Sequence, residues 1–381
     1  MFDDILRIIQ SKYPDQSFIP LHEPKFVGKE KEYLMDCIDS TFVSSVGEYV
    51  DKFENMICDL TGSKYAVAIV NGTNALHLSL LISGVEAGDE VITQSLSFIA
   101  TANAISYSGA IPVFIDVDKD TLGMSPESLS LFLNKNARMS DNGVCYNKIT
   151  NNRIKSCIPM HTFGHPCKID ELASICNNWN IKLIEDAAES IGSIYKGKQT
   201  GTYGELGIFS FNGNKTITAG GGGAIITDDE DLASQLKHLS TQAKIPHQWE
   251  FKHDRIGYNY RMPNLNAALA CAQLEKLEIY IEDKRQLAAF YNDAFSMLKV
   301  DFQIEPNNCK SNYWLNSLVF SNKSERDDFL KYSNSNGVMT RPIWNLISSM
   351  KMYSTFQTDS LKVSKWLSDR LVNIPSSVRI K

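Results

Sequence analysis

The chain has 381 residues, of which 43% are hydrophobic and 22% charged, with a formal net charge of −6 and a pI near 5.7. This composition is typical of a folded globular protein, and the length allows one large and one smaller domain. The mildly acidic balance, without runs of lysine and arginine, excludes nucleic acid and anionic membrane surfaces as expected partners.

Residues 1–10 are partly apolar, but Asp3, Asp4 and Arg7 interrupt the run. They predict a short amphipathic arm that packs on a subunit, and neither a signal peptide nor a membrane span. The eight cysteines lack the paired spacing of a zinc site or a disulfide framework. We therefore expect buried or idle thiols in a reducing cytoplasm, and no metal site.

From about Tyr65 onward, short apolar runs alternate with helical patterns, which indicates βα units and a largely parallel sheet. The first units are a strand at 65–70, a helix from Asn71 and Gly72 to about 84, a strand at 90–93, a helix around 99–107 and a strand at 111–115. After a polar segment at 134–152, interpreted as a loop, further units are expected at 156–160, 169–179, 182–184, 206–211 and 224–227. The pattern is that of a doubly wound α/β domain.

The composition shifts after residues 259–263. Long helical periodicity follows over residues 265–295, and the rest is typical of a smaller α+β domain. We accordingly divide the chain into an N-terminal arm (1–25), a large domain (26–264) and a small C-terminal domain (265–381).

Polar residues that directly follow the strands carry the chemistry, because open α/β sheets bind ligands outside the carboxyl ends of their strands. Gly72 and Thr73 come after the first strand and begin a helix, where backbone amides and the helix dipole favour a phosphate. Taken alone, a glycine at such a position is more often only a turn.

Asp186 follows the strand at 182–184. Pyridoxal phosphate (PLP) is an electron sink only while its ring nitrogen is protonated, and a fixed carboxylate is the usual means of keeping it so. Asp186 is the candidate for that role, although on local grounds it could equally be the N-cap of the next helix.

Lys215 follows the strand at 206–211, among small and flexible residues and just before four consecutive glycines. Desolvation lowers the pKa of such a lysine, which frees its amine to form an imine and later to move a proton. A lone lysine is usually a solvated surface residue, so the hypothesis depends on the phosphate-type turn and the strand-end carboxylate that accompany it.

Four stretches together resemble the DegT/DnrJ/EryC1/StrS family of PLP-dependent sugar aminotransferases, and the resemblance extends over nearly the whole chain from Pro20. They are residues 72–76, residues 185–189, residues 209–215 with the glycine run, and residues 257–262. The resemblance implies fold type I, a large domain with a mostly parallel seven-stranded sheet, and a smaller C-terminal α+β domain.

The same resemblance assigns roles around the cofactor. Lys215 would carry PLP as a Schiff base, and Asp186 would pair with the ring nitrogen. Glu189 would lie near the phenolic oxygen, and Gly72, Thr73 and Ser210 would hold the phosphate. Phe98 would stack on the ring, although from the residues alone it could be a core side chain. Asn259 would reach the phosphate of a neighbouring subunit, which implies a homodimer with shared active sites; its local alternative is a turn asparagine.

Within the family, residues 21–24, 42–47, 163–166 and 243–249 are similar to the aminotransferase of the legionaminic acid pathway. This implies transfer of an amino group from L-glutamate to UDP-2-acetamido-4-keto-2,4,6-trideoxyglucose in glycan biosynthesis. Enzymes of the GDP-perosamine, bacillosamine and dTDP-sugar types share the same core motifs and stay as alternatives. Candidates for holding the nucleotide or the donor carboxylate are His161, Lys244, His247, Arg255, Arg341 and Trp344.

Three other functions compete. A PLP-dependent sugar dehydratase of this family would have histidine in place of Lys215. A nicotinamide-dependent oxidoreductase would need a glycine-rich turn after its first strand, whereas Gly220 to Gly223 lie between late strands. A non-catalytic regulator of the family would not need Lys215, Asp186 and the phosphate turn together.

Overall fold

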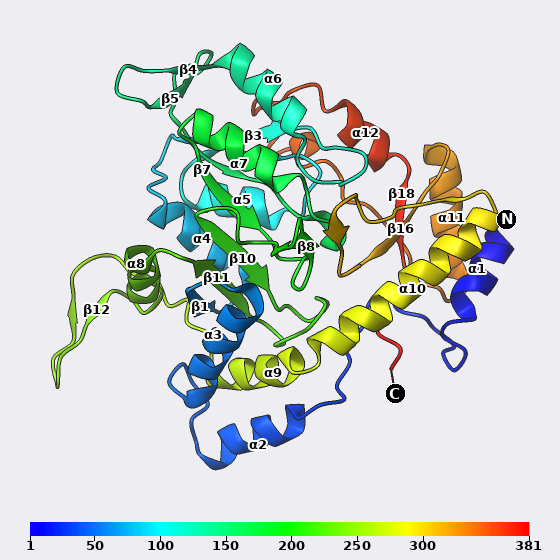
Figure 1. The fold of residues 1–381 in the computed structure, drawn as a ribbon, viewed down its shortest axis with the longest axis horizontal. Coiled ribbons are helices and arrows are strands. Elements are labelled where there is room, and N and C mark those ends of the chain that lie inside the picture. Colours follow the sequence, from blue (N-terminus) through cyan, green and yellow to red (C-terminus); the bar gives the residue numbers. More distant parts are fainter. Residues whose placement is uncertain (381) are drawn as a thin grey trace.

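The computed structural model describes residues 1–380, and its centre is a seven-stranded sheet in the order β1-β11-β10-β7-β6-β2-β3 (Figure 1). β11 runs antiparallel to both of its neighbours, and the four other neighbouring pairs are parallel. The strands are β1 (Tyr65–Ile69), β2 (Glu90–Gln94), β3 (Ile111–Ile115), β6 (Ile154–Ile158), β7 (Lys182–Asp186), β10 (Leu206–Ser210) and β11 (Gly223–Thr227). The predicted α/β fold with a mostly parallel seven-stranded sheet is confirmed.

Helices cover both faces of this sheet, because its strands are apolar on both sides. On one face, apolar side chains of β1, β7 and β11 pack against α4 (Gly72–Ile82), α5 (Ala100–Tyr107) and α8 (Glu230–Ser240). The other face is covered by α2 (Glu30–Asp39), α3 (Glu48–Thr61), α6 (Pro126–Asn136), α7 (Ile169–Asn178) and α9 (Asn264–Leu274). This doubly wound arrangement places the loops after β1, β7 and β10 along one edge of the sheet.

Two sequence expectations need correction. The segment expected to be a loop at 134–152 contains the end of α6 and a hairpin of β4 (Ala137–Met139) and β5 (Cys145–Asn147). Its polar side chains hid the hairpin, whose turn uses Gly143 at φ 75° and whose Asn147 side chain donates to Glu90 at 2.7 Å. The long helix expected over 265–295 is two helices, α9 and α10 (Leu277–Met297), separated at Glu275 and Lys276.

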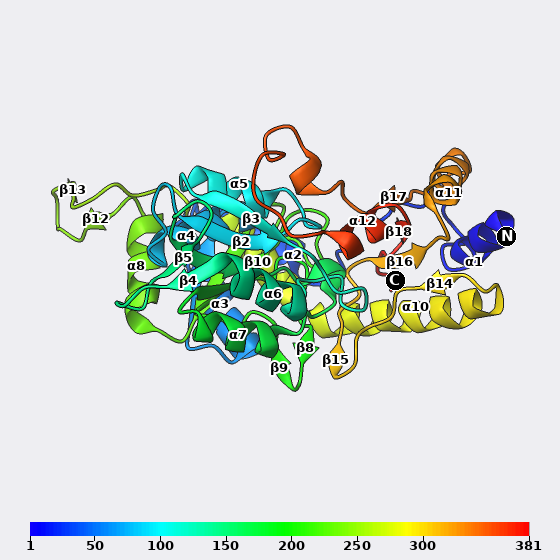
Figure 2. The same ribbon diagram turned by 90° about the horizontal axis from the view of Figure 1, so that it is seen from above.

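The C-terminal part contains a four-stranded antiparallel sheet in the order β14-β16-β18-β17. The long helix α10 joins it to the large sheet (Figure 2). Its strands and helices are β14 (Asp301–Phe302), β16 (Asn316–Val319), β17 (Arg341–Pro342), β18 (Leu371–Ile374), α11 (Lys323–Ser335) and α12 (Lys362–Ser368). A further three-stranded sheet, β15-β8-β9, consists of β8 (Ile194–Tyr195), β9 (Lys198–Gln199) and β15 (Cys309–Lys310).

The N-terminal helix α1 (Phe2–Gln10) packs on this C-terminal part of its own chain. Ile5, Leu6 and Ile9 are buried in one cluster with Leu287 of α10 and Phe329 of α11. The arm predicted to pack on a subunit thus has an intrachain partner for its apolar face. The domain boundaries at residues 25 and 264 stay predictions. Among residues 1–380, no helix is long and apolar enough to cross a membrane.

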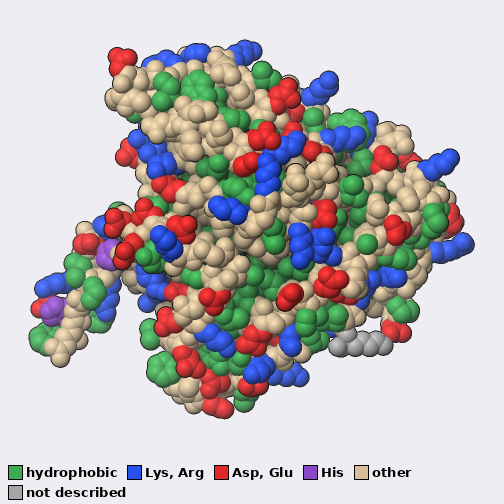
Figure 3. Space-filling model, in the orientation of Figure 1, with side chains coloured by type: hydrophobic (Ala, Val, Ile, Leu, Met, Phe, Trp, Pro, Cys, Tyr) green, Lys and Arg blue, Asp and Glu red, His purple; other side chains and the backbone are tan. Residues whose placement is uncertain are grey.

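Another hairpin, β12 (Lys244–Ile245) with β13 (Lys252–His253), projects away from the body of the molecule (Figures 1 and 2). The space-filling view shows histidine and basic side chains along it (Figure 3). Its aromatic side chains are strongly exposed, with Trp249 at 72% and Phe251 at 82%. A hairpin with this exposure buries little apolar surface within its own chain.

Candidate active site

Lys215 lies in the loop between β10 and β11, at the sheet edge described above. Its Nζ donates a hydrogen bond to Glu189 Oε1 at 3.2 Å and lies 4.1 Å from the centre of the Trp314 ring. The indole is fixed in turn, because Trp314 Nε1 donates to the backbone carbonyl of Asn214 at 2.6 Å. A lysine with only 12% of its side chain exposed, held by a carboxylate and an aromatic face, differs from an ordinary solvated lysine.

Glu189 is almost completely buried, and burial raises the pKa of its carboxyl to about 7 against the opposing charge of Lys215. The backbone N–H of Phe163 donates to Glu189 Oε2 at 2.9 Å. Phe163 adopts φ 57°, a conformation that is costly for an aromatic residue and that clusters at functional sites. Glu189 can therefore gain or lose a proton near neutral pH beside Lys215.

Asp186 ends β7 with its side chain buried. Its Oδ2 accepts from Thr101 Oγ1 at 2.7 Å, and its Oδ1 accepts from the Ala188 backbone N–H at 3.2 Å. Burial raises the pKa of this carboxyl despite these two hydrogen bonds. A buried carboxylate is stabilised by a cationic partner, and the protonated ring nitrogen of PLP is such a partner, so Asp186 fits the cofactor.

The start of α4 and the end of β10 form the candidate phosphate cradle. Asn71 caps the helix by accepting from the Asn74 N–H at 2.8 Å, and the amides of Gly72 and Thr73 belong to the first turn, which has no helical acceptors. A Cβ at Gly72 would come within 2.9 Å of Ser210 Cβ. The glycine therefore permits the close approach of the helix start to Ser210 that a shared phosphate requires.

Aromatic side chains line one side of the site. Phe98, two residues before α5, is 49% exposed, so the alternative that it is a core residue is wrong. Its ring centre lies 6.3 Å from that of Trp344, which lies 4.8 Å from that of Phe163. The structure thus brings Phe98 and Trp344 together in one aromatic group with Phe163 and Trp314.

His161 does not line the site in the way expected of a substrate contact. It is fully buried, and its Nε2 bonds Glu185 Oε2 at 3.0 Å. The Cys167 backbone N–H donates to its Nδ1 at 3.2 Å, so Nδ1 carries no proton and the ring donates from Nε2. With both nitrogens engaged, the predicted contact with substrate is replaced by a structural role beside β7.

Lys244 and His247 belong to the projecting β12–β13 hairpin and lie away from the loops after β7 and β10 (Figure 1). The Lys244 ammonium lies 4.5 Å from the centre of the Phe251 ring, and His247 Nδ1 accepts from the Glu250 N–H at 3.0 Å. Arg255 is exposed just after this hairpin. The structure therefore does not join these three side chains to the Lys215 cluster of the same chain.

Asn259 and Arg341 are also exposed. Asn259 pairs with Thr241 in an isolated bridge, and the next residues run beside the end of β1, where the Val70 N–H donates to the Tyr260 carbonyl at 2.8 Å. Arg341 donates to Asn334 Oδ1 on α11 at 3.3 Å. Neither contacts Lys215, and the predicted roles of both stay predictions.

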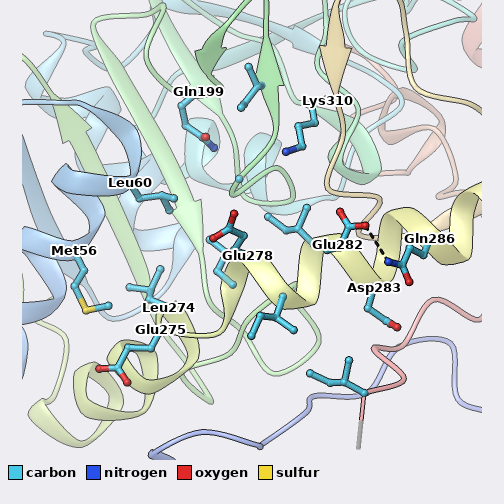
Figure 4. Close-up of a pocket in the computed structure, with 16 residues that line it drawn as sticks. Met56, Leu60, Gln199, Leu274, Glu275, Glu278, Glu282, Asp283, Gln286 and Lys310 are labelled. Atoms are coloured by element: carbon cyan, nitrogen blue, oxygen red, sulfur yellow. Dashed lines mark hydrogen bonds between the residues drawn. The ribbon is translucent and has the colours of Figure 1, made fainter.

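A pocket of about 790 Å³ lies elsewhere, between α3, α9, α10 and the β8–β9 hairpin (Figure 4). Leu60 and Leu274 contribute to its apolar floor, whereas Glu275, Glu278 and Glu282 are acidic residues around it. Carboxylates repel phosphate and carboxylate groups, so this pocket does not suit a nucleotide or glutamate. It contains none of the predicted site residues.

Several residues of the site have no signal in the sequence. Thr101, Phe163 and Trp314 contact Asp186, Glu189 and Lys215, but they come from different parts of the chain, and no motif assigns these contacts to them. Only the tertiary structure brings them together. Phe163 alone lies in a quoted stretch, at the start of residues 163–166, and that resemblance did not indicate a contact with Glu189.

Comparison with known proteins agrees with this geometry. The model of the DegT/DnrJ/EryC1/StrS aminotransferase family matches residues 24–381. The chain is 38% identical over 359 residues to a GDP-perosamine synthase of Escherichia coli O157:H7, covering 94% of this chain and 93% of that protein.

Two solved structures share the fold. The aminotransferase TlmJ of Streptoalloteichus hindustanus is 24% identical with a TM-score of 0.85, over 96% of this chain and 95% of that one. A mutant of GDP-4-keto-6-deoxymannose-3-dehydratase (ColD) with bound GDP-perosamine is 25% identical with a TM-score of 0.83, over 95% and 96%. These likenesses confirm the predicted fold type I.

The relatives correct one expectation. Sequence stretches suggested the legionaminic acid pathway, but the perosamine synthase supports the stated GDP-perosamine alternative better. The match over nearly the whole chain identifies the broader group without ambiguity. The chain belongs to the DegT/DnrJ/EryC1/StrS family of PLP-dependent aminotransferases.

Proposed function

We propose that the protein transfers the amino group of L-glutamate to a nucleotide-linked 4-keto-6-deoxy sugar. The observation that carries this proposal is the position of Lys215 Nζ, 3.2 Å from Glu189 and beside the buried Asp186 strand end. Bound PLP supplies an aldehyde that accepts amino groups and a ring that stabilises negative charge at the reacting carbon. The residues of the chain supply position and proton transfer.

Lys215 Nζ anchors the cofactor and, once freed by glutamate, moves the proton at the reacting carbon. Glu189 holds the freed ammonium at 3.2 Å and can take up its proton, because its own pKa is raised to about 7. The Trp314 ring covers the lysine and excludes water from one side.

Asp186 would keep the ring nitrogen protonated, and Thr101 fixes the orientation of that carboxylate. Gly72, Thr73 and Ser210 would hold the phosphate, and Phe98 would lie against the ring. A dehydratase of this family could hold the cofactor with the same contacts but would have histidine at position 215. Lys215 itself is therefore the reason to favour transamination over dehydration.

For the acceptor we favour a GDP-linked sugar that yields GDP-perosamine, as the name of the relative from Escherichia coli indicates for that protein. UDP-2-acetamido-4-keto-2,4,6-trideoxyglucose is the second candidate, supported by the four legionaminic-type stretches. A homodimer with shared sites also belongs to this proposal. It is supported by the exposure of Asn259 and Lys244, neither of which contacts Lys215 of its own chain.

The test is a matched assay of GDP-, UDP- and dTDP-linked 4-keto-6-deoxy sugars with glutamate, with products identified by mass and NMR. We expect 2-oxoglutarate and a 4-amino sugar, with the GDP-linked acceptor preferred. Preference for the UDP-linked acceptor would instead support the legionaminic or bacillosamine type. Absence of transamination with every acceptor would contradict the proposal.

A further inference from the structure

His22 lies in a segment that precedes α2 and is tied to the C-terminal part of the chain. The Ser376 N–H donates to the Leu21 carbonyl at 2.8 Å, and the Glu23 N–H donates to Ser377 Oγ at 3.0 Å. Leu21 also packs against the cluster that contains Phe163 and Trp314. Hydrogen bonds on both sides of His22 thus fix the backbone that carries it beside the aromatic side of the candidate site.

The ring of His22 has an unusual environment. Both ring nitrogens are buried, yet neither has a hydrogen-bond partner among residues 1–380. Buried polar atoms in folded proteins are nearly always satisfied, and an exception in a site calls for a partner from outside the chain. Burial first, and then the charges of Lys284 and Lys215, hold the pKa of His22 well below its usual value.

The charges around His22 restrict the kind of partner. Lys284 is fully buried and donates to the backbone carbonyl of Trp314 at 3.2 Å, and Trp314 in turn covers Lys215. A neutral imidazole within the electrostatic reach of both lysines offers one donor and one acceptor and no positive charge. A hydroxyl group, which also donates and accepts, complements it better than a carboxylate or a phosphate does.

We propose that His22 binds a hydroxyl group of the hexose ring of the acceptor and so contributes to the choice of sugar. The inference rests on the proposed function and adds a residue to which sequence motifs assign no role. We expect His22 to act on the acceptor half-reaction, because a sugar hydroxyl can use both its donor and its acceptor, whereas a glutamate carboxylate can only accept.

Two variants and one control test this. His22→Phe keeps a ring but loses both nitrogens, His22→Gln keeps a donor and an acceptor, and Glu23→Gln changes the neighbouring side chain, which bonds Gln16. Each half-reaction is followed separately by cofactor absorbance, first with glutamate and then with the keto sugar. Calorimetry on PLP-free protein compares GDP with a GDP-linked hexose, and circular dichroism checks folding.

We expect His22→Phe to raise the KM for the keto sugar roughly tenfold, the loss expected for one hydrogen bond, with the glutamate half-reaction unchanged. Binding of GDP alone should be unchanged and binding of the GDP-linked hexose weakened. His22→Gln should recover part of the loss, and Glu23→Gln should match the wild type.

Equal slowing of both half-reactions, or a His22→Phe variant with the wild-type KM and hexose affinity, would overturn the inference. If His22→Phe fails to fold, His22→Gln decides. The inference then expects a KM for the keto sugar above the wild-type value with an unchanged glutamate half-reaction, and a wild-type KM would overturn it. A wild-type protein that converts no keto sugar contradicts the proposed function itself, whereas an active wild type with unaffected variants contradicts only the role of His22.

Discussion

At the scale of single residues, the site depends on charged groups held out of water. Glu189, Asp186 and Lys215 are all mostly buried, and each depends on the others or on the cofactor for compensation. Removing one partner of such a group leaves the remaining charge uncompensated, which costs more than an exposed ion pair contributes. Substitutions here should therefore change both chemistry and pH dependence.

Asp186→Asn should lower kcat at least about 100-fold, because an amide keeps the shape of the carboxylate but not the charge that protonates the ring nitrogen. The measurement is the turnover rate with glutamate, accompanied by the absorbance spectrum of the bound cofactor. The variant should stay folded, since Thr101 can still donate to the amide oxygen. A variant with near wild-type turnover would remove Asp186 from the proposed role.

The raised pKa of Glu189 predicts that the stability of the PLP-free protein depends on pH. Its pKa is raised from 4.5 to about 7, so the folded state binds this proton more tightly than the unfolded state does. Stability therefore falls as pH rises through this interval, by roughly 3 kcal/mol for a shift of this size. Glu189→Gln removes the titration, so its melting temperature relative to wild type should increase between about pH 5 and pH 8.

The control for this measurement is Glu278→Gln, at an exposed position on α10. Thermal unfolding of the three proteins across the pH range decides the matter. For the control, the difference in melting temperature from the wild type should not change with pH. If the difference for Glu189→Gln is equally constant, Glu189 does not take up a proton in the folded protein.

At the scale of elements, the helix starts and strand ends were largely predictable, and the side chains that cross between elements were not. The strand at Ile111–Ile115 has the predicted bounds, and α4 begins at the predicted Gly72. Alternation of apolar runs and turn residues encodes these features locally. The hairpin at β4–β5 was missed because backbone pairing and one glycine, rather than apolar periodicity, form it.

The site shows the same division. Lys215, Asp186 and Gly72 lie at or just after strand ends and could be found by their place in the alternating pattern. Trp314 could not, because its contact with Lys215 joins parts of the chain separated by about 100 residues. His161 misled for a related reason: a histidine after a strand gives no sign of whether it turns toward the site or, as here, toward buried Glu185.

The junction of α4 and β10 gives a prediction at this scale. Gly72→Ala should weaken PLP binding at least about tenfold, because the added Cβ would lie 2.9 Å from Ser210 Cβ and would separate the two parts of the cradle. Gly221→Ala is the matched control, since its Cβ would have no neighbour nearer than 3.8 Å. Titration of PLP into both apo variants gives the two affinities, and equal affinities would contradict the cradle.

At the scale of the whole molecule, the exposed hairpin and Asn259 bear on assembly. Asn259→Ala should reduce activity, and a 1:1 mixture with Lys215→Ala, refolded together, should recover about a quarter of wild-type activity. This follows because only the mixed dimer contains one site with both native residues. The assay compares the mixture with each variant refolded alone, and a mixture no more active than its components would assign Asn259 to its own chain or to no site.

The most direct test of the central claim is reduction of the PLP-loaded protein with borohydride, followed by peptide mapping. The account predicts a yellow protein and a cofactor fixed through Nζ of Lys215, with Lys215→Ala folded but inactive. Lys284, fully buried and with its pKa lowered to about 7, is the other lysine chemically suited to such a bond. Attachment at Lys284, or a colourless protein that binds no PLP, would contradict the account.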